Sequence, residues 1–383
     1  MRKELRIGFT GGGTGGHIYP LLAVADLVGE KLNHSQIEFK FYYFGSPGQY
    51  AQEFLKRNFK IINIISSKIR RYASAENILD IIKFPFSLAQ AFFKMLFIMP
   101  DVIFSKGGTG AVPVVIAAWF YRIPVFIHES DSIPGLSNKI SFSFSKAVAV
   151  SFKKTLDFFS GEKVNLVGNP VRSFLIEPSP DLNGEKAKKI FGFDSQLPLI
   201  LVLGGSQGSQ RINEFMLDNV KKFVEKYQVL HQVGSENFND FKSELAVATE
   251  SFIPEERTRY KIVGFLNNEI KEAMIACDLV VSRAGSGAIF EISAFKKPSI
   301  LIPLAESAGN HQFYNAYEYA QNGAAIVIEE DNLKSDIFFS QLRLVLENKT
   351  KYNLMSEASG KFFNPQSAEI IADELIKLAE KNN

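Results

Sequence analysis

Short apolar runs alternate with amphipathic stretches along almost the whole chain, and this alternation is interrupted once and then begins again. In the first half, the runs predicted as strands are residues 6–9, 37–44, 60–65, 101–104, 124–128, 147–150 and 163–167. In the second half they are residues 199–203, 228–232, 261–263, 278–282, 299–302 and 324–329. Helices are expected between them, among others at residues 20–32, 112–121, 209–225 and 366–381. Because strands that alternate with helices form βαβ units, the sequence predicts an α/β fold with parallel sheets.

The interruption, at residues 168–184, contains three prolines and reads as a linker between domains. Segments 6–28 and 199–220 resemble each other, since each reads as a strand, a glycine-rich turn and a helix. We therefore expect two similar α/β domains, as the length of 383 residues also suggests at roughly 150 residues per domain. Ligands of such sheets bind outside the carboxyl ends of the strands, which implies a cleft between two facing domains.

Composition excludes several classes of protein. With 43 basic and 41 acidic residues the net charge is +2, so the overall charge does not indicate a nucleic-acid-binding protein. The single cysteine, Cys277, excludes an intrachain disulfide, and the five histidines show no metal-ligand spacing. We expect no signal peptide, because the N-terminus breaks into glycines before an apolar stretch forms. The most apolar region, residues 78–99, is interrupted by Asp80, Lys83 and Pro85, so it is not expected to span a membrane.

The first glycine-rich turn, residues 10–17, follows directly after a predicted strand. Such a turn lets backbone approach an anion, and the next helix offers its N-terminal amides. Gly11, Gly13 and Gly16 satisfy the dinucleotide pattern GxGxxG, but no acid ends the second strand as that fold requires. A nucleoside-triphosphate loop is also excluded, because His17 stands where its lysine belongs. The alternatives are a tight turn without a ligand, and a His17 that is structural rather than a base or a sugar-orienting group.

Two further polar segments follow strands of the first domain. Residues 105–110 form a second glycine turn, which either admits an anionic ligand or is only structural. Residues 128–135 cluster polar side chains where α/β enzymes place their chemistry. Within this segment, Glu129 and Asp131 also fit a metal pair, and Asp131 fits a helix cap.

The second domain repeats this arrangement. Ser206, in the turn 204–208, and nearby amides are candidates to hold a phosphate. Small residues at 284–288 open a helix that carries Glu291, which either accepts two ribose hydroxyls or is a solvated helix glutamate. A last polar set, with His311 and Gln312, follows the next strand.

In this order and spacing, the motifs resemble those of the bacterial undecaprenyl-diphospho-muramoylpentapeptide β-N-acetylglucosaminyltransferases, the MurG family. The stretches that carry the resemblance are GGGTGGHIYPLLAVADLV, HESDSIPGLSNK, GNPVR, LGGSQGSQRIN, SRAGSGAIFEISA and HQFYNA, between residues 11 and 316. The resemblance implies the GT-B architecture of two Rossmann-like domains. It places an acceptor and membrane domain at 1–168 and a UDP-GlcNAc domain at 169–359, with a C-terminal helix at about 360–383 packing back on the first.

The resemblance also implies a reaction. GlcNAc passes from UDP-GlcNAc to the C4 hydroxyl of the MurNAc unit of lipid I, with inversion and without metal or cofactor, giving lipid II for peptidoglycan and thus for cell-wall growth, shape and division. Rivals are a glycolipid synthase with a diacylglycerol acceptor, a nucleotide-dependent oxidoreductase and a non-catalytic sugar-nucleotide binder. The missing acid after the second strand opposes the oxidoreductase.

Site residues follow from the same resemblance, position by position. The residues implied to contact UDP-GlcNAc are Thr14, Gly15, Gly16, Asp131, Arg172, Ser206, Leu266, Glu291, His311 and Gln312. Among them, Arg172 and Ser206 match diphosphate contacts, the Leu266 backbone matches a uracil contact and Glu291 matches the ribose carboxylate. His17 is expected to act in catalysis or acceptor positioning, with Asp131 and then Glu129 as further candidate bases. Two positions depart from many relatives, with aspartate for asparagine at 131 and alanine for threonine at 288, and one departs from some, with histidine for glutamine at 311.

Because the lipid acceptor stays in its bilayer, the enzyme is expected at the cytoplasmic face of the bacterial membrane, as a peripheral protein on an anionic surface. Residues 78–99 are the candidate docking element, with apolar residues at helical spacing that Pro85 kinks or divides. These apolar residues are Ile78, Ile82, Phe86, Phe93 and Phe97, with Trp119 in a neighbouring helix. The basic residues that flank or interrupt them are Lys68, Arg70, Arg71, Lys83 and Lys94. The alternative is that these aromatic residues pack in the core of the first domain.

Overall fold

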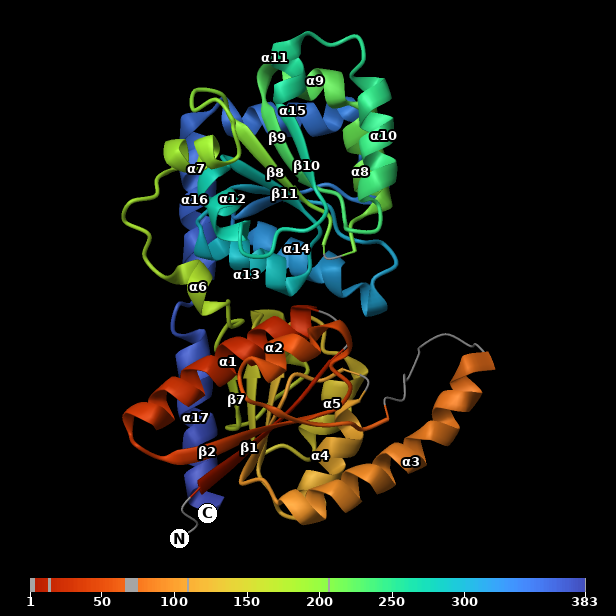
Figure 1. Cartoon of the computed structure of the whole chain (residues 1–383), viewed down its shortest axis with the longest axis vertical. Coiled ribbons are helices and arrows are strands. Elements are labelled where there is room, and N and C mark those ends of the chain that lie inside the picture. The colour runs from red at the N-terminus through yellow and green to blue at the C-terminus, as the bar shows by residue number, and fades with distance from the viewer. Residues whose placement is uncertain (1–3, 13–14, 66–74, 109, 206, 383) are drawn as a thin grey trace. The chain divides into compact units, whose positions relative to one another are not determined.

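A computed structural model describes residues 4–12, 15–65, 75–108, 110–205 and 207–382, with side chains from 83 onward in the third range. The chain forms two units (Figure 1). The first comprises Met1–Arg172 together with Asn364–Asn383, and the second comprises Ser173–Phe363. Thr14 and Ser206, which the sequence singles out, lie outside the described residues, as do Lys68, Arg70 and Arg71.

The first unit is built on a seven-stranded sheet of order β3-β2-β1-β4-β5-β6-β7, and every pairing in it is parallel. Its strands are β1 (Glu4–Thr10), β2 (Glu38–Phe44), β3 (Lys60–Ile62), β4 (Val102–Ser105), β5 (Val125–Glu129), β6 (Ala147–Val150) and β7 (Val164–Leu166). Its helices are α1 (Gly15–His34), α2 (Ala51–Leu55), α3 (Ala75–Ile98), α4 (Ala111–Phe120), α5 (Leu136–Phe142) and α17 (Ser367–Asn382). Side chains on the two faces of this sheet form separate cores, because successive residues of a strand point to opposite faces.

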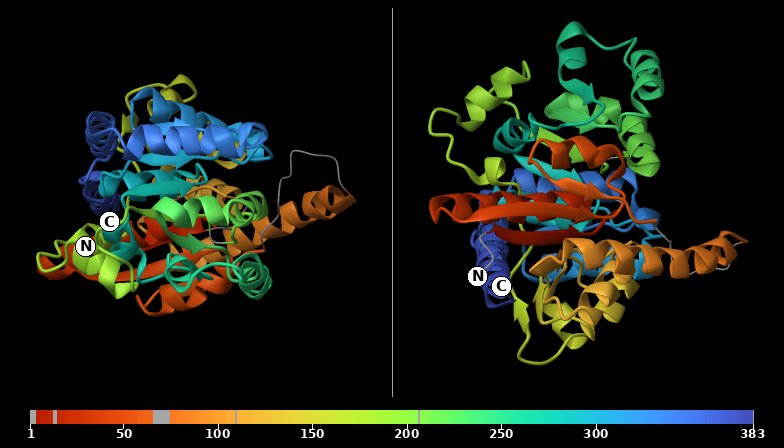
Figure 2. Two further views of the ribbon diagram at one scale, coloured as in Figure 1. Left: turned by 90° about the horizontal axis from the view of Figure 1, so that it is seen from above. Right: turned by 60° about the horizontal axis from the view of Figure 1, so that its bottom comes forward.

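One core, around Phe9, Phe41 and Phe104, is covered by α1 and α17, and the two helices also contact each other. The other, around Ile103, Val115 and Val148, is covered by α3 and α4. Both views in Figure 2 show α3 extending beyond the edge of this unit's sheet. Because α17 packs against α1 and this sheet, the last helix of the chain belongs to the first unit.

The second unit has a six-stranded sheet of order β10-β9-β8-β11-β12-β13, also parallel throughout. Its strands are β8 (Leu199–Leu203), β9 (Gln228–Gln232), β10 (Tyr260–Val263), β11 (Leu279–Ser282), β12 (Ser299–Leu301) and β13 (Ala325–Val327). Its helices include α6 (Ser173–Ile176), α7 (Gly184–Ile190), α8 (Gln210–Asp218), α9 (Val220–Lys226), α10 (Phe238–Ala248), α11 (Pro254–Thr258) and α12 (Ile270–Ala276). The remaining helices are α13 (Ser286–Ala294), α14 (His311–Gln321), α15 (Ser335–Leu346) and α16 (Lys349–Phe362). The predicted α/β class with two Rossmann-like parallel-sheet domains is confirmed.

Some predicted boundaries are wrong. The single helix expected at 209–225 is two helices, α8 and α9, which meet at Asn219. Asn219 lies outside the helical region at φ −110°, ψ 9°, and its side-chain amide donates to the Phe215 carbonyl, so it closes the first helix. Pro85 lies inside one continuous helix, α3, and does not divide it. Within the described ranges, no helix is long and apolar enough to cross a membrane.

Candidate active site

Two glycine turns lie against each other at the carboxyl edge of the first unit's sheet. Gly107 and Gly108 have φ values of +77° and +91°, which side chains other than glycine rarely adopt. A Cβ on Gly108 would stand 2.9 Å from the Gly12 carbonyl oxygen, so only glycine permits this contact. The backbone of Lys106 also donates to the Thr10 carbonyl at 3.0 Å. The glycines that the sequence places after two neighbouring strands therefore form one backbone surface.

The first turn of α1 holds Gly15, Gly16 and His17, so the glycine-rich segment 10–17 ends inside this helix. His17 is half-buried. Two residues after His17, the Tyr19 ring carries the Arg172 guanidinium at 4.7 Å from its centroid and contacts Tyr50 edge to face. Arg172, the last residue before the second unit, is thus held beside the start of α1 by a contact that the sequence analysis did not anticipate.

A wholly buried lysine lies directly beneath these loops. Lys106 Nζ contacts His128 Nδ1 and Ser130 Oγ, and Asn169 Oδ1 at 3.3 Å. The His128 ring in turn uses Nε2 toward the Gly168 carbonyl at 2.9 Å and the Ser151 hydroxyl at 3.2 Å. Burial, above all, lowers the pKa of Lys106 to about 7, and burial also lowers the pKa of His128 well below its usual value.

Glu129 supports the loop that follows β5. Its Oε1 accepts the Asp131 amide at 3.0 Å, and its Oε2 accepts the Gly135 amide at 3.0 Å and Asn138 Nδ2 at 2.9 Å. Glu129 is 4% exposed, and burial followed by the charge of Asp131 raises its pKa to about 7. The Glu129 carboxylate therefore receives hydrogen bonds ahead of α5, and Asp131 is half-buried in the same loop.

In the second unit, the turn after β8 is built for close backbone approach. Gly208 has a φ of +79°, and a Cβ there would stand 2.1 Å from the Val233 carbonyl oxygen. Ser209 then caps α8 by accepting the Ile212 amide. Gln232 links this turn to Leu266, because its Nε2 donates to the Gly205 carbonyl and its Oε1 accepts the Leu266 amide, each at 2.9 Å.

An arginine that sequence reasoning missed connects the remaining loops of this edge. Arg283, directly after β11, donates to the Ile302 carbonyl at 3.1 Å and to Ser209 Oγ at 2.7 Å. It also pairs at 2.5 Å with Glu330, whose side chain is 2% exposed and also pairs with Arg211. The position of Arg283 at a strand end was a usable signal, but nothing local marks Glu330, which comes from the turn after β13.

The predicted polar set at the next strand lies around the start of α14. Gln312 Oε1 accepts the Leu304 amide at 3.1 Å, and His311 Nδ1 contacts the Ala308 carbonyl at 2.9 Å. Asn315 Nδ2 donates to the Ala284 carbonyl at 3.2 Å, which joins α14 to the loop before α13. Glu291 is half-buried on α13, in the helix that this loop opens. Hydrogen bonds at this sheet edge thus link the loops of Leu266 and Gln312 with the loop that opens α13, the helix that carries Glu291. Within the described ranges, no group of three or more His, Cys, Asp or Glu is placed to hold a metal ion.

Comparison with protein-family models gives two matches. Residues 7–150 match the glycosyltransferase family 28 N-terminal domain and residues 199–371 match the glycosyltransferase family 28 C-terminal domain. The matches therefore cover the whole second sheet and all strands of the first sheet except β7 and the start of β1.

Curated relatives align over nearly their whole length. The UDP-N-acetylglucosamine--N-acetylmuramyl-(pentapeptide) pyrophosphoryl-undecaprenol N-acetylglucosamine transferase of Clostridium tetani is 33% identical, covering 100% of this chain and 98% of that protein. The protein of the same name from Treponema denticola is 32% identical, covering 98% of both. Among solved structures, Acinetobacter baumannii MurG is similar in fold with a TM-score of 0.72, 22% identity and coverage of 97% of this chain and 99% of that one.

Proposed function

The chain belongs to glycosyltransferase family 28, and we propose that it transfers N-acetylglucosamine from UDP-GlcNAc to N-acetylmuramyl-(pentapeptide) pyrophosphoryl-undecaprenol, lipid I. The observation that carries the proposal is the 33% identity to a transferase of that name across both proteins' lengths. It also confirms the family resemblance of the motifs. The product is lipid II, and the bond forms at the C4 hydroxyl of MurNAc with inversion of the anomeric centre.

The second unit binds the donor in this proposal. Glu291 accepts the ribose hydroxyls, and His311 and Gln312 contact the sugar. The Leu266 amide already donates to Gln232, so we assign the uracil contact to the carbonyl oxygen of Leu266. Ser206 and Arg172 contact the diphosphate, where the N-terminal amides of a helix take the place of a cation. The tyrosine beneath Arg172 supports this role, since it holds the guanidinium in one place.

The first unit binds the acceptor and removes its proton. We assign the base to His17, with Asp131 as the second candidate, and Thr14, Gly15 and Gly16 to the donor-sugar side. Glu129 is the weakest candidate base, because both of its oxygens already accept hydrogen bonds within its own loop. As the C4 oxygen attacks the anomeric carbon, His17 takes the hydroxyl proton and UDP leaves with the electron pair of the broken bond.

We place the protein on the cytoplasmic face of the bacterial membrane, held at an anionic surface by α3 and α4. Support comes from large apolar side chains that face solvent on these two helices. Their exposed fractions are 64% for Phe86, 65% for Phe93, 69% for Phe97, 54% for Trp119 and 61% for Phe120. These fractions oppose the alternative that the residues pack in a core. Ile78 and Ile82 belong to the same prediction, but their side chains lie outside the described part of the chain.

The transferase proposal is tested by incubating the protein with UDP-GlcNAc and a short-chain lipid I analogue. UDP release together with a β1,4-linked disaccharide product is expected. A diacylglycerol acceptor is the control, because it represents the rival glycolipid synthase. Transfer to diacylglycerol alone, or UDP release without a disaccharide, would refute the proposal.

The membrane proposal is tested by sedimentation with anionic vesicles. We expect Phe86→Ser combined with Phe93→Ser to abolish salt-sensitive binding while UDP affinity and folding stay unchanged. Phe158→Ser, at an exposed phenylalanine outside α3 and α4, is the matched control. A folding defect in the double variant would show a core role, and unchanged vesicle binding would place the contact elsewhere.

A further inference from the structure

Lys106 is the most deeply buried charged group at the carboxyl edge of the first unit. It is 1% exposed, and Ser130, Asn169 and His128 around it are 4%, 1% and 0% exposed. Strand register explains the contact with His128, because Ser105 pairs with Ile127 and the next residues on the two strands are therefore neighbours. Asn169 comes from beyond β7, so Lys106 connects two loops that are far apart in sequence.

Counting protons assigns each partner a role. An ammonium group has three N–H donors, and Lys106 Nζ has three neighbours that can accept, namely His128 Nδ1, Ser130 Oγ and Asn169 Oδ1. The neutral His128 ring then carries its proton on Nε2, where it donates to the Gly168 carbonyl. The Ser130 hydroxyl is left to donate to Asn169 Oδ1 at 3.2 Å. All three N–H donors of Lys106 have an acceptor when the lysine is charged.

The segment 128–131 is thereby held from both sides. Residues 128 and 130 point toward Lys106, whereas Glu129 points the other way and accepts the Asp131 amide. Lys106 also directly precedes the glycines that contact Gly12, and its backbone amide donates to the Thr10 carbonyl, so its backbone and its side chain anchor different loops of the same edge.

We propose that Lys106 is a positioning residue whose ammonium group fixes the segment carrying Asp131 to the loop that leads to Arg172, in the geometry that transfer requires. The inference rests on the proposed function, because transfer is its main readout.

Loss of one proton rearranges this cluster. A neutral amine keeps two N–H donors and gains a lone pair, so Ser130 turns its hydroxyl toward Lys106 and no longer donates to Asn169. Burial is the largest influence on the pKa of Lys106 and lowers it to about 7, while the charges of Glu129 and Asp131 raise it. His128 stays neutral at this pH, since its own pKa is lowered. The charged form of the cluster therefore gives way to the neutral form close to neutral pH.

The test compares Lys106→Met with wild type in the transferase assay between pH 6 and pH 9. We expect kcat of the variant to fall at least tenfold at pH 6.5, with KM for UDP-GlcNAc changed less than twofold. Wild type should lose activity above about pH 7 with the loss of one proton, and this alkaline limb should be absent from Lys106→Met. Ser130→Ala should move the limb to lower pH, because it removes an acceptor of the charged form.

Lys163→Met is the matched control. Lys163 lies at the opposite edge of the same sheet and donates to the Phe142 and Ser145 carbonyls. The Lys163→Met variant should keep the wild-type kcat and the wild-type loss of activity above about pH 7. An unchanged kcat in Lys106→Met, or an unchanged limb in both Lys106→Met and Ser130→Ala, would overturn the inference. An inactive wild-type protein would instead refute the proposed function, so the two failures are distinguishable.

Discussion

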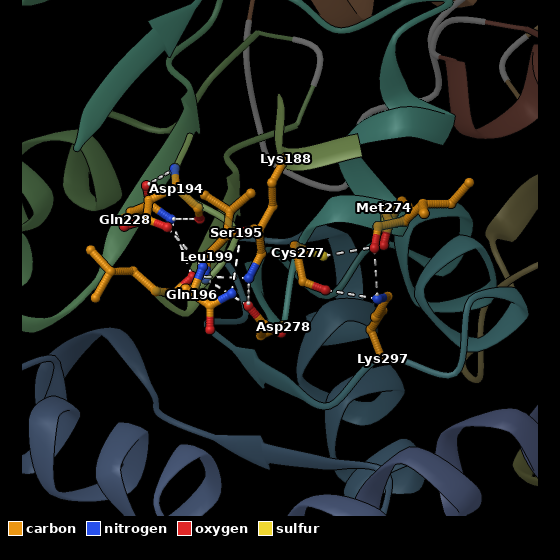
Figure 3. Close-up of polar contacts among 12 residues, drawn as sticks. Lys188, Asp194, Ser195, Gln196, Leu199, Gln228, Met274, Cys277, Asp278 and Lys297 are labelled. Carbon is orange, nitrogen blue, oxygen red and sulfur yellow. Dashed lines mark hydrogen bonds and ion pairs between the residues drawn. The ribbon is translucent and has the colours of Figure 1, made fainter. Parts of the chain in front are cut away.

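Two buried lysines, one at the carboxyl edge of the first unit's sheet and one at the amino edge of the second unit's sheet, have different kinds of hydrogen-bond partner. At the carboxyl edge of the first unit, the groups among the described residues that contact Lys106 are all neutral. At the amino edge of the second unit, Lys188 pairs with Asp278 at 2.9 Å and donates to the Leu197 carbonyl (Figure 3). Asp278 also accepts the Leu199 amide at 2.7 Å, so this pair ties down the start of β8.

The amino-edge cluster continues in the same manner. Gln228 joins the Asp194 backbone to the Leu197 carbonyl, and Lys297 donates to the Cys277 carbonyl at 2.7 Å. Burial raises the pKa of the Cys277 thiol to about 11, so it remains uncharged. Lys188 and Lys297 are matched by a carboxylate and by carbonyls, whereas Lys106, near the proposed chemistry, contacts only neutral side chains and burial lowers its pKa to about 7. This difference is typical of functional sites.

The largest expected effect is on catalysis at the carboxyl edge. His17→Ala should lower kcat roughly 10²–10⁴-fold, the range for a general base, while UDP affinity and stability change little. Transferase kinetics and UDP titration measure both quantities. His34→Ala, at the exposed opposite end of α1, is the control. A near wild-type rate for His17→Ala would remove His17 from the site and leave Asp131 as the candidate base.

Next comes a stability effect at the amino edge. Asp278→Ala leaves Lys188 buried without its partner and should lower the free energy of unfolding by about 2–3 kcal/mol, since Asp278 is partly exposed. Chemical denaturation measures the change. Asp336→Ala, in the exposed pair with Lys222, should change it by less than about 0.5 kcal/mol. If kcat rather than stability changes in Asp278→Ala, the proposed division between the two edges is wrong.

A smaller effect is expected on nucleotide binding in the second unit. Glu291→Ala should weaken UDP binding by about 2 kcal/mol, within the range for hydrogen bonds to a charged group. Glu291→Gln should lose less, because one acceptor remains. Titration calorimetry measures the affinities, with Glu225→Ala on the exposed face of α9 as the control. Unchanged affinity in Glu291→Ala would show that Glu291 is only a helix residue.

The smallest effect, taken per pH unit, is a slope of stability with pH. The pKa of Lys106 is about 7 in the folded protein and about 10.4 in an unfolded chain, so between these values the unfolded state binds more protons. Wild-type stability should therefore rise from pH 7 to pH 10, relative to Lys106→Met, by at most about 1.4 kcal/mol per pH unit. Denaturation midpoints of the two proteins across this range measure the slope. Parallel curves would mean that Lys106 titrates normally.

The sequence predicted the architecture because its signals are local. Alternating strands and helices and the glycines after β1, β4 and β8 indicate parallel sheets with loops at one edge, whatever the rest of the chain does. The sequence also predicted which loops carry polar groups, including His128, Glu129 and Asp131. The family motifs added Arg172, which no local pattern distinguishes from an ordinary surface residue, and they favoured the ribose-binding interpretation of Glu291.

Only the tertiary structure decided which polar groups meet. Lys106 and Asn169 are 63 residues apart, and Arg283 reaches Glu330 across two further strands. Periodicity fixes the face on which a side chain lies but not its partner, because the partner comes from another strand whose register is set by packing of the whole sheet. For the same reason, sequence alone left open that Glu129 is occupied by its own loop and that Tyr19 lies under Arg172.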